Sequence, residues 1–139
     1  MEDMTIKIYE AIKNNKEFMS HVNESDIKFF DYPNAQEIKN IAVVIDPLDT
    51  PKPRNFGDND NLTYEYLYQI DVFVKQKNGV NGRVLSDRLV FLLQRIMWEE
   101  LGFGETSSMK PEYIKDFNLY RQAKRFEGKQ YYKDRKSVV

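Results

Sequence analysis

The clearest pattern along the chain is an alternation of apolar and polar side chains over residues 62–75. The intervening positions are mostly polar, apart from Leu67 and Phe73. Successive side chains of a β-strand point to opposite faces, so the pattern predicts one long strand with a buried face and a solvated face. Strands average about 5–6 residues, so a strand this long must bend through a bulge or project beyond its own domain. The buried face is predicted to carry Leu62, Tyr64, Tyr66, Tyr68, Ile70, Val72 and Val74.

Helical spacing predicts two helices, over residues 3–20 and 83–101. Asp3 is placed to cap the first helix, and Gly102 to end the second. The first helix is expected to bury Met4, Ile8, Ala11 and Ile12. The second is expected to bury Leu85, Leu89, Leu92, Leu93 and Ile96, with a further apolar face formed by Val90, Met97 and Trp98.

Three further strands complete the predicted order α-β-β-β-α-β. They cover residues 26–32, 40–46 and 113–127, and the second of them is apolar enough to be buried on both faces. Gly128 could form a turn or a bulge after the last strand. We expect an α+β fold in which two helices cover one face of a mainly antiparallel four-stranded sheet. One domain spans residues 1–133, and residues 134–139 are expected to be a disordered tail.

The segment between the second and third strands, residues 47–61, breaks the periodicity. Its three prolines, Pro47, Pro51 and Pro53, stiffen its first half, and a cluster of Gly, Asp and Asn loosens its second half. A loop of about 15 residues is usually functional or disordered. Because it leads into the long strand, we expect a hairpin-like arm and would look there first for partner contacts.

Composition narrows the class of protein. The 139 residues suit one domain, and the absence of cysteine excludes disulfides, thiolate metal sites and a cysteine nucleophile. No apolar run approaches the roughly 18 residues of a membrane span, and the first residues lack the pattern of a signal peptide. Residues 1–110 carry 13 basic and 18 acidic side chains, or −5, and residues 111–139 carry 8 and 4, or +4. Such asymmetry indicates either a nucleic-acid patch or subunits that meet through opposite charges.

Catalytic and cofactor motifs are weak. Residues 57–62 begin like a calcium loop, but Leu62 stands at the sixth position, where that loop needs glycine. The glycines at 102 and 104 follow a helix rather than a strand, so they do not form a dinucleotide fingerprint. His21, the single histidine, has no recognisable nucleophile partner. We therefore expect no enzyme activity, no cofactor and no metal.

Basic and aromatic side chains alternate over residues 120–133, as in proteins that bind single-stranded nucleic acid. The same pattern suits an amphipathic strand whose aromatics pack and whose bases face solvent or an acidic neighbour. With a net charge of −1 for the whole chain, we favour the amphipathic strand, because nucleic-acid domains are usually basic.

The succession of segments over residues 3–133 resembles a family of small proteins of long-tailed bacteriophages and prophages. The resemblance is carried by Tyr32-Pro33, VVIDPL (43–48), LTYEYLYQIDVFVK (62–75), WEELGFG (98–104) and AKRFEGKQYY (123–132). These proteins are encoded between head and tail genes and are similar to tail-terminator or tail-completion proteins. The resemblance implies a non-catalytic ring, a hexamer, which caps the tail tube and joins it to the head.

That resemblance also implies partners and a location. The partners would be copies of the chain itself, the major tail tube protein and a head connector or head-closure protein, with DNA passing through the lumen unread. The location would be the virion neck and, during assembly, the host cytoplasm. A heterologous ring needs two different patches on each subunit. We assign these contacts to Leu67, Phe73, Val90, Met97, Trp98, Pro51, Pro53, Arg54, Phe56, Asp58, Asp60, Arg121, Lys124 and Arg125.

Two alternatives stay open. The chain could be another neck component, such as a head-closure or tail-completion factor. It could also be a small nucleic-acid-binding module that uses residues 120–132.

Overall fold

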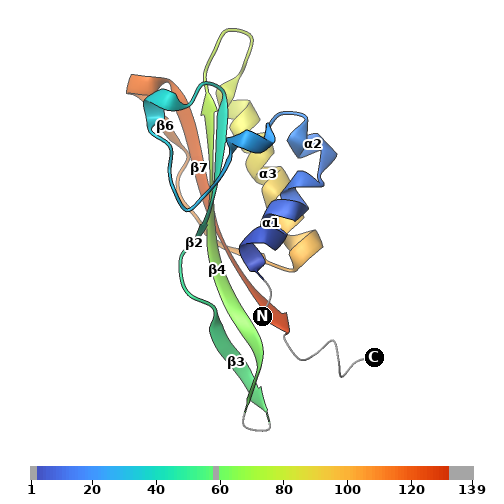
Figure 1. The fold of residues 1–139 in the computed structure, drawn as a ribbon. Helices are drawn as coiled ribbons and strands as arrows, with labels where there is room; N and C mark the ends of the chain where they lie inside the picture. Colours follow the sequence, from blue (N-terminus) through green and yellow to red (C-terminus); the bar gives the residue numbers. More distant parts are fainter. Residues whose placement is uncertain (1–2, 58–59, 132–139) are drawn as a thin grey trace.

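The computed structural model describes residues 3–57 and 60–131, with the side chains of residues 54–63 and 130–131 left aside. It is an α+β fold in which helices cover one face of a mixed, mostly antiparallel seven-stranded sheet (Figure 1). The main strand order is β1-β2-β4-β7-β5; β3 pairs with β4, and β6 pairs with β7. The prediction of four strands was therefore too low. The strands are β1 (Ile27–Phe29), β2 (Ile41–Pro47), β3 (Lys52–Gly57), β4 (Asp60–Lys75), β5 (Gly104–Ser108), β6 (Glu112–Ile114) and β7 (Leu119–Tyr131).

The first predicted helix is divided in two, α1 (Met4–Lys13) and α2 (Lys16–Met19). The Asp3 carboxylate accepts a hydrogen bond from the Ile6 amide and so caps α1 as predicted. The Asn15 side chain accepts from the Phe18 amide and caps α2. Because a side chain that caps a new helix favours a break in the previous one, the consecutive asparagines at 14 and 15 end α1 early.

The second predicted helix is confirmed as α3 (Gly82–Leu101). Asn81 caps its start, and Gly102 ends it with a left-handed φ of 70°. Together, α1, α3 and one face of β2 and β4 enclose the main core. The predicted inward face of β4 is confirmed for Tyr66, Tyr68, Ile70, Val72 and Val74, which all lie in this core.

The opposite face of β4 is not solvated, contrary to the alternation argument. Phe73 lies in a second, smaller core with Ala42 and Val44 of β2 and with Leu119 of β7. The connection from β1 to β2 supplies Ile38 to this core, and Ile114 and Phe117 pack against it. Short 3-10 turns at Ala35–Glu37 and Lys115–Phe117 bring these residues over the sheet. The face is covered by irregular segments, which have no period that sequence inspection can detect.

The segment 47–61 is not an irregular loop throughout. Lys52–Gly57 forms β3, which pairs antiparallel with β4 from Lys52 opposite Glu65 to Gly57 opposite Asp60. Pro53 is tolerated because β3 is an edge strand, where a missing N–H need not break the ladder. The expected hairpin-like arm is present, and it extends past the helical layer (Figure 1). The two strands join through residues 58–59, which lie outside the described residues, as does the predicted tail at 134–139.

The last predicted strand is also divided. β6 is short, a 3-10 turn follows, and Asn118 reverses the chain with a φ of 53° before β7 begins. β7 then runs through Gly128 without a break and pairs with β4 from Lys75 opposite Leu119 to Thr63 opposite Tyr131. A Cβ at Gly128 would lie 2.2 Å from the Phe103 ring. Gly128 therefore provides room for an aromatic side chain and does not form a turn.

Candidate functional site

A buried ion pair lies on the face of the sheet that the helices do not cover. Arg121 of β7 donates from Nε and Nη2 to Oδ2 of Asp71 on β4, at 2.8 and 2.6 Å. The Asp71 side chain is completely buried, and Arg121 keeps 27% of its side chain exposed. The Arg121 guanidinium also lies 5.5 Å from the centre of the Phe73 ring. A carboxylate that is buried away from water must be paired and hydrogen-bonded. Arg121 therefore neutralises Asp71 and is not free to bind a partner.

The Tyr32 hydroxyl completes this polar cluster. It lies 2.9 Å from Oδ1 of Asp71 and 3.2 Å from Oδ2 of Asp46, so its proton is shared between two carboxylates. Gln69 donates to the same Oδ1 at 2.8 Å and accepts from Arg125 Nε at 3.0 Å. Burial, and then the negative charges of Asp71 and Asp46, raise the pKa of Tyr32. The cluster therefore connects the segment after β1 with β2, β4 and β7. Its polar groups are hydrogen-bonded to one another within the chain.

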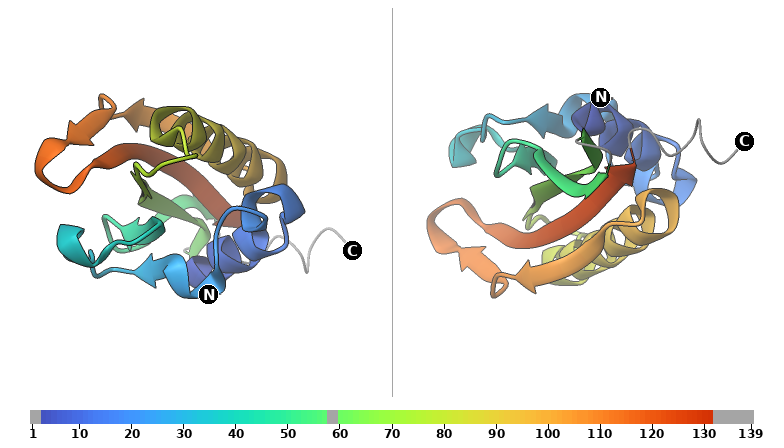
Figure 2. Two further views of the ribbon diagram at one scale, coloured as in Figure 1. Left: turned by 90° about the horizontal axis from the view of Figure 1, so that it is seen from above. Right: turned by 90° about the horizontal axis from the view of Figure 1, so that it is seen from below.

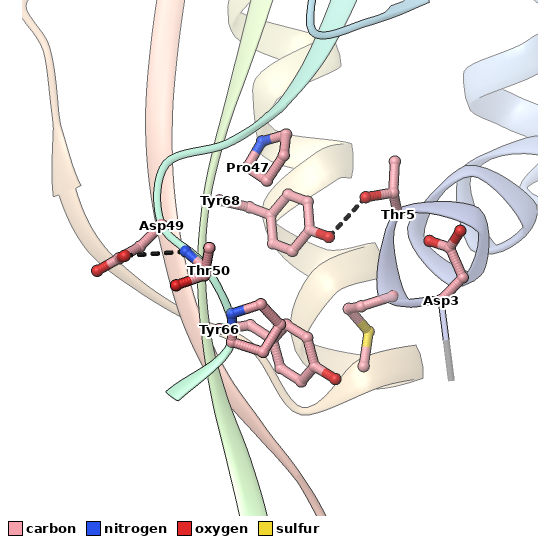
Figure 3. Close-up of a pocket in the computed structure, with 9 residues that line it drawn as sticks. Asp3, Thr5, Pro47, Asp49, Thr50, Tyr66 and Tyr68 are labelled. Carbon is pink, nitrogen blue, oxygen red and sulfur yellow. Dashed lines mark hydrogen bonds between the residues drawn. The ribbon is translucent and has the colours of Figure 1, made fainter. Parts of the chain in front are cut away.

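A pocket of about 430 Å³ opens between the start of α1 and the connection from β2 to β3 (Figure 3). Tyr66 and Tyr68 of β4 line the pocket, together with Pro47 and Pro51. The Thr5 and Tyr68 hydroxyls are hydrogen-bonded at 2.6 Å. Burial raises the pKa of Tyr68, although the Thr5 contact opposes this shift. The pocket is predominantly apolar, with Asp3 and Asp49 at its rim, and suits an apolar side chain better than a reaction centre.

His21 lies beside a smaller pocket of about 210 Å³ with Asn23, Asp26 and Lys75. Among the described residues that line this pocket there is neither a serine nor a cysteine. Across the described ranges, no group of three or more His, Cys, Asp or Glu side chains is arranged to hold a metal ion. Within those ranges, no helix is long and apolar enough to cross a membrane.

The exposed face of α3 carries a line of apolar side chains, of which sequence inspection found only Trp98. Val84, Phe91 and Trp98 are spaced by seven residues and keep 50, 51 and 55% of their surface exposed. Seven residues make almost two helical turns, so the three side chains lie along one line, here called the α3 stripe. The detectable signal was this heptad spacing. It was hidden by Val90 and Met97, which were predicted to be partner contacts but are buried in the main core.

The other predicted contact residues have mixed placements. Phe73 was predicted to face outward but is buried, and Leu67 is half-buried. Lys124 pairs with Glu105 of the same chain at 3.3 Å, so this basic side chain, like Arg121, already meets an acid within its own subunit. Pro51 borders the pocket of Figure 3, and Pro53 is exposed on β3. The side chains of Arg54, Phe56, Asp58 and Asp60 lie outside the described residues.

Comparison with known proteins identifies no relative. No model of a protein family matches the chain, and no curated protein matches it. Functional inference therefore depends on the residues and on their geometry.

Proposed function

We propose that the chain is a non-catalytic structural protein of a bacteriophage or prophage, which forms a ring that caps the tail tube and joins it to the head. The observation that carries this proposal is the arm formed by β3 and the first part of β4, from Lys52 to Glu65. The proposal is also supported by the resemblance of residues 3–133 to tail-terminator and tail-completion proteins.

The arm is longer than the domain requires. Among the described residues, the pairing of β4 with β7 ends at Thr63, yet β3 and β4 stay paired as far as Gly57 opposite Asp60. A two-stranded ribbon beyond a core is only marginally stable by itself. A ribbon that extends past the helical layer (Figure 1) is therefore suited to contact a neighbouring molecule.

The two edges of the sheet offer further surfaces for assembly. β1 and β3 form one edge, and β5 and β6 form the other. Open edges offer unpaired backbone groups that a partner strand can use. A subunit with two different edges and a projecting arm suits head-to-tail contacts around a ring.

The nucleic-acid alternative has less support. Phe126 is completely buried, and Tyr120 packs against Tyr113 with ring centres 4.7 Å apart. The basic side chains between them have partners within the chain, because Arg121 pairs with Asp71 and Lys124 pairs with Glu105. Nucleobases stack only on exposed aromatic faces. The aromatic and basic side chains of β7 are therefore better explained as part of the fold.

Electron microscopy of particles assembled without the protein tests the proposal and its nearest alternative. A tail terminator predicts headless tails of uncontrolled length. Another neck protein predicts tails of normal length that fail to join heads. Complete, infectious particles in the absence of the protein would overturn both assignments.

A further inference from the structure

We propose that a second copy of this chain packs against the α3 stripe, and that it does so head to tail through a different patch at the ends of β1 and β2. This end patch consists of Phe30, Asp31, Leu48 and Asp49. The inference rests on the proposed function, because a ring needs self-contacts, and it identifies the two surfaces that make them.

The α3 stripe has the form of a helix contact without its partner. Its three side chains are each about half exposed, whereas Leu89, Leu93 and Ile96 already pack the opposite face of α3 into the core. The exposed face is therefore not needed to hold α3 in place. Large apolar side chains in a line on an exposed helix mark a docking face.

The end patch has a strained aromatic residue at its centre. Phe30 follows β1 with a φ of 66°, a left-handed conformation that is strained for a bulky residue. Its ring is also 57% exposed. Neither property stabilises the isolated chain, and such strain is typical of positions that serve an interaction.

The end patch is also held rigidly. The Phe30 amide donates to the Ile45 carbonyl at 3.1 Å, and the Leu48 amide donates to the Leu67 carbonyl at 2.9 Å. These bonds present both apolar side chains from a fixed backbone. A preformed surface loses less entropy when it binds than a flexible one.

The charges around the two patches are complementary. Arg88 and Arg95 lie on one side of the α3 stripe, and the Arg88 guanidinium is 5.5 Å from the centre of the Phe91 ring. Asp31 and Asp49 directly follow Phe30 and Leu48 in the chain and are exposed, and Asp49 pairs with Lys52 at 2.9 Å. Within the chain, Arg88 pairs with Glu17 and Arg95 pairs with Glu99, both in exposed positions. Exposed pairs contribute little to stability, so exchanging partners at an interface costs little.

The positions of the patches favour a heterologous contact over a two-fold one. In both views of Figure 2, β7 lies between α3 and the segment that follows β1. Two complementary patches on opposite sides of one subunit lead to a chain or a closed ring.

Site-specific cross-linking tests this inference in the full chain, which has no cysteine of its own. Gln94→Cys places a thiol beside the α3 stripe, and Thr50→Cys places one beside the end patch. The two variants are mixed in equal amounts, with one carrying a mass tag, and then mildly oxidised. We expect the mixed 94–50 dimer to form about tenfold faster than either like dimer, which corresponds to about 1.4 kcal/mol of preference.

Met109→Cys is the matched control, because Met109 is exposed between β5 and β6, outside both patches. Adding Phe91→Ser to the Gln94→Cys chain, or Phe30→Asn to the Thr50→Cys chain, should reduce the mixed dimer to the level of this control. Asparagine tolerates the left-handed backbone, so Phe30→Asn should fold. Predominant 94–94 dimers, or no dimer above the control, would overturn the head-to-tail assignment.

The outcome is separable from that of the proposed function. A mixed dimer together with normal particles in the absence of the protein would retain the interface and reject the phage role. Defective tails without a mixed dimer would retain the role and reject the interface.

Discussion

Arg121 and Asp71 are joined diagonally across two neighbouring strands. In the register of β4 and β7, Arg121 stands opposite Phe73, and its guanidinium reaches the carboxylate two residues away at 2.6 Å. The pair thus connects the smaller core to the polar cluster around Tyr32. The face of the sheet opposite the helices, which irregular segments cover, depends on this contact.

Removing Arg121 should therefore destabilise the fold. Arg121→Ala leaves the Asp71 carboxylate buried without its counter-ion, and we expect a loss of about 3–5 kcal/mol in the free energy of unfolding. Urea unfolding measures this change. The double variant Asp71→Asn/Arg121→Met should be more stable than Arg121→Ala, because no charge remains buried. Lys124→Ala is the matched control and should cost less than about 1 kcal/mol, since its pair with Glu105 is more exposed. Equal effects of the two single changes would contradict the prediction.

Gly128 should not tolerate a side chain. Gly128→Ala places a methyl group 2.2 Å from the Phe103 ring, and overpacking of this kind costs about 1–3 kcal/mol. Gly104→Ala is the control, because a Cβ there meets nothing within 4 Å. Thermal unfolding of the two variants should separate them by several degrees. Phe103→Leu in the Gly128→Ala background should recover part of the loss, and an absence of recovery would point to a backbone cause instead.

Tyr32 should make the protein sensitive to alkaline pH. Its pKa is raised in the folded state, so above pH 10, the ordinary tyrosine value, the unfolded chain releases this proton first. Stability from Tyr32 is thus complete below that pH and is lost as pH rises. Tyr32→Phe should make the decline in unfolding free energy between about pH 9 and 11 shallower. Tyr68→Phe should act in the same direction, because burial raises the pKa of Tyr68 as well. Unchanged slopes in both variants would refute the assignment.

Neighbouring residues of α3 should differ in what they affect. Met97→Ala empties part of the main core and should cost about 2–5 kcal/mol of stability. Trp98→Ala should change stability by less than about 1 kcal/mol, because more than half of its surface is exposed. Trp98→Ala should instead weaken self-association, measured by light scattering at high protein concentration. A large loss of stability in Trp98→Ala would show that Trp98 supports the fold.

Shortening the arm should separate folding from assembly. Replacing residues 54–63 with Asn-Gly joins β3 to β4 after the pair Pro53 and Tyr64, through a favoured hairpin turn. The replacement removes none of the described residues of the main core, so we expect a cooperative unfolding transition like that of the parent. Particles assembled with this variant should show the same tail defect as particles that lack the protein. Normal tails would mean that the arm is dispensable for the proposed function.

The sequence by itself determined the elements that have a strong period. The inward face of β4, the length of α3, the caps at Asp3 and Gly102 and the apolar run Ile41–Ile45 of β2 all follow from local spacing and local hydrogen bonding. These features depend on residues within a few positions of one another, so the sequence alone contains the necessary information.

Tertiary structure decided the rest. β3 exists because β4 provides a partner for a proline-containing edge strand, and Asp71 and Phe73 are buried because segments without a period cover them. The α3 stripe became visible only once Val90 and Met97 were placed in the core and Val84, Phe91 and Trp98 outside it. In each case the deciding contact joins residues far apart in the chain. Their proximity depends on how the elements pack, which local propensity does not specify.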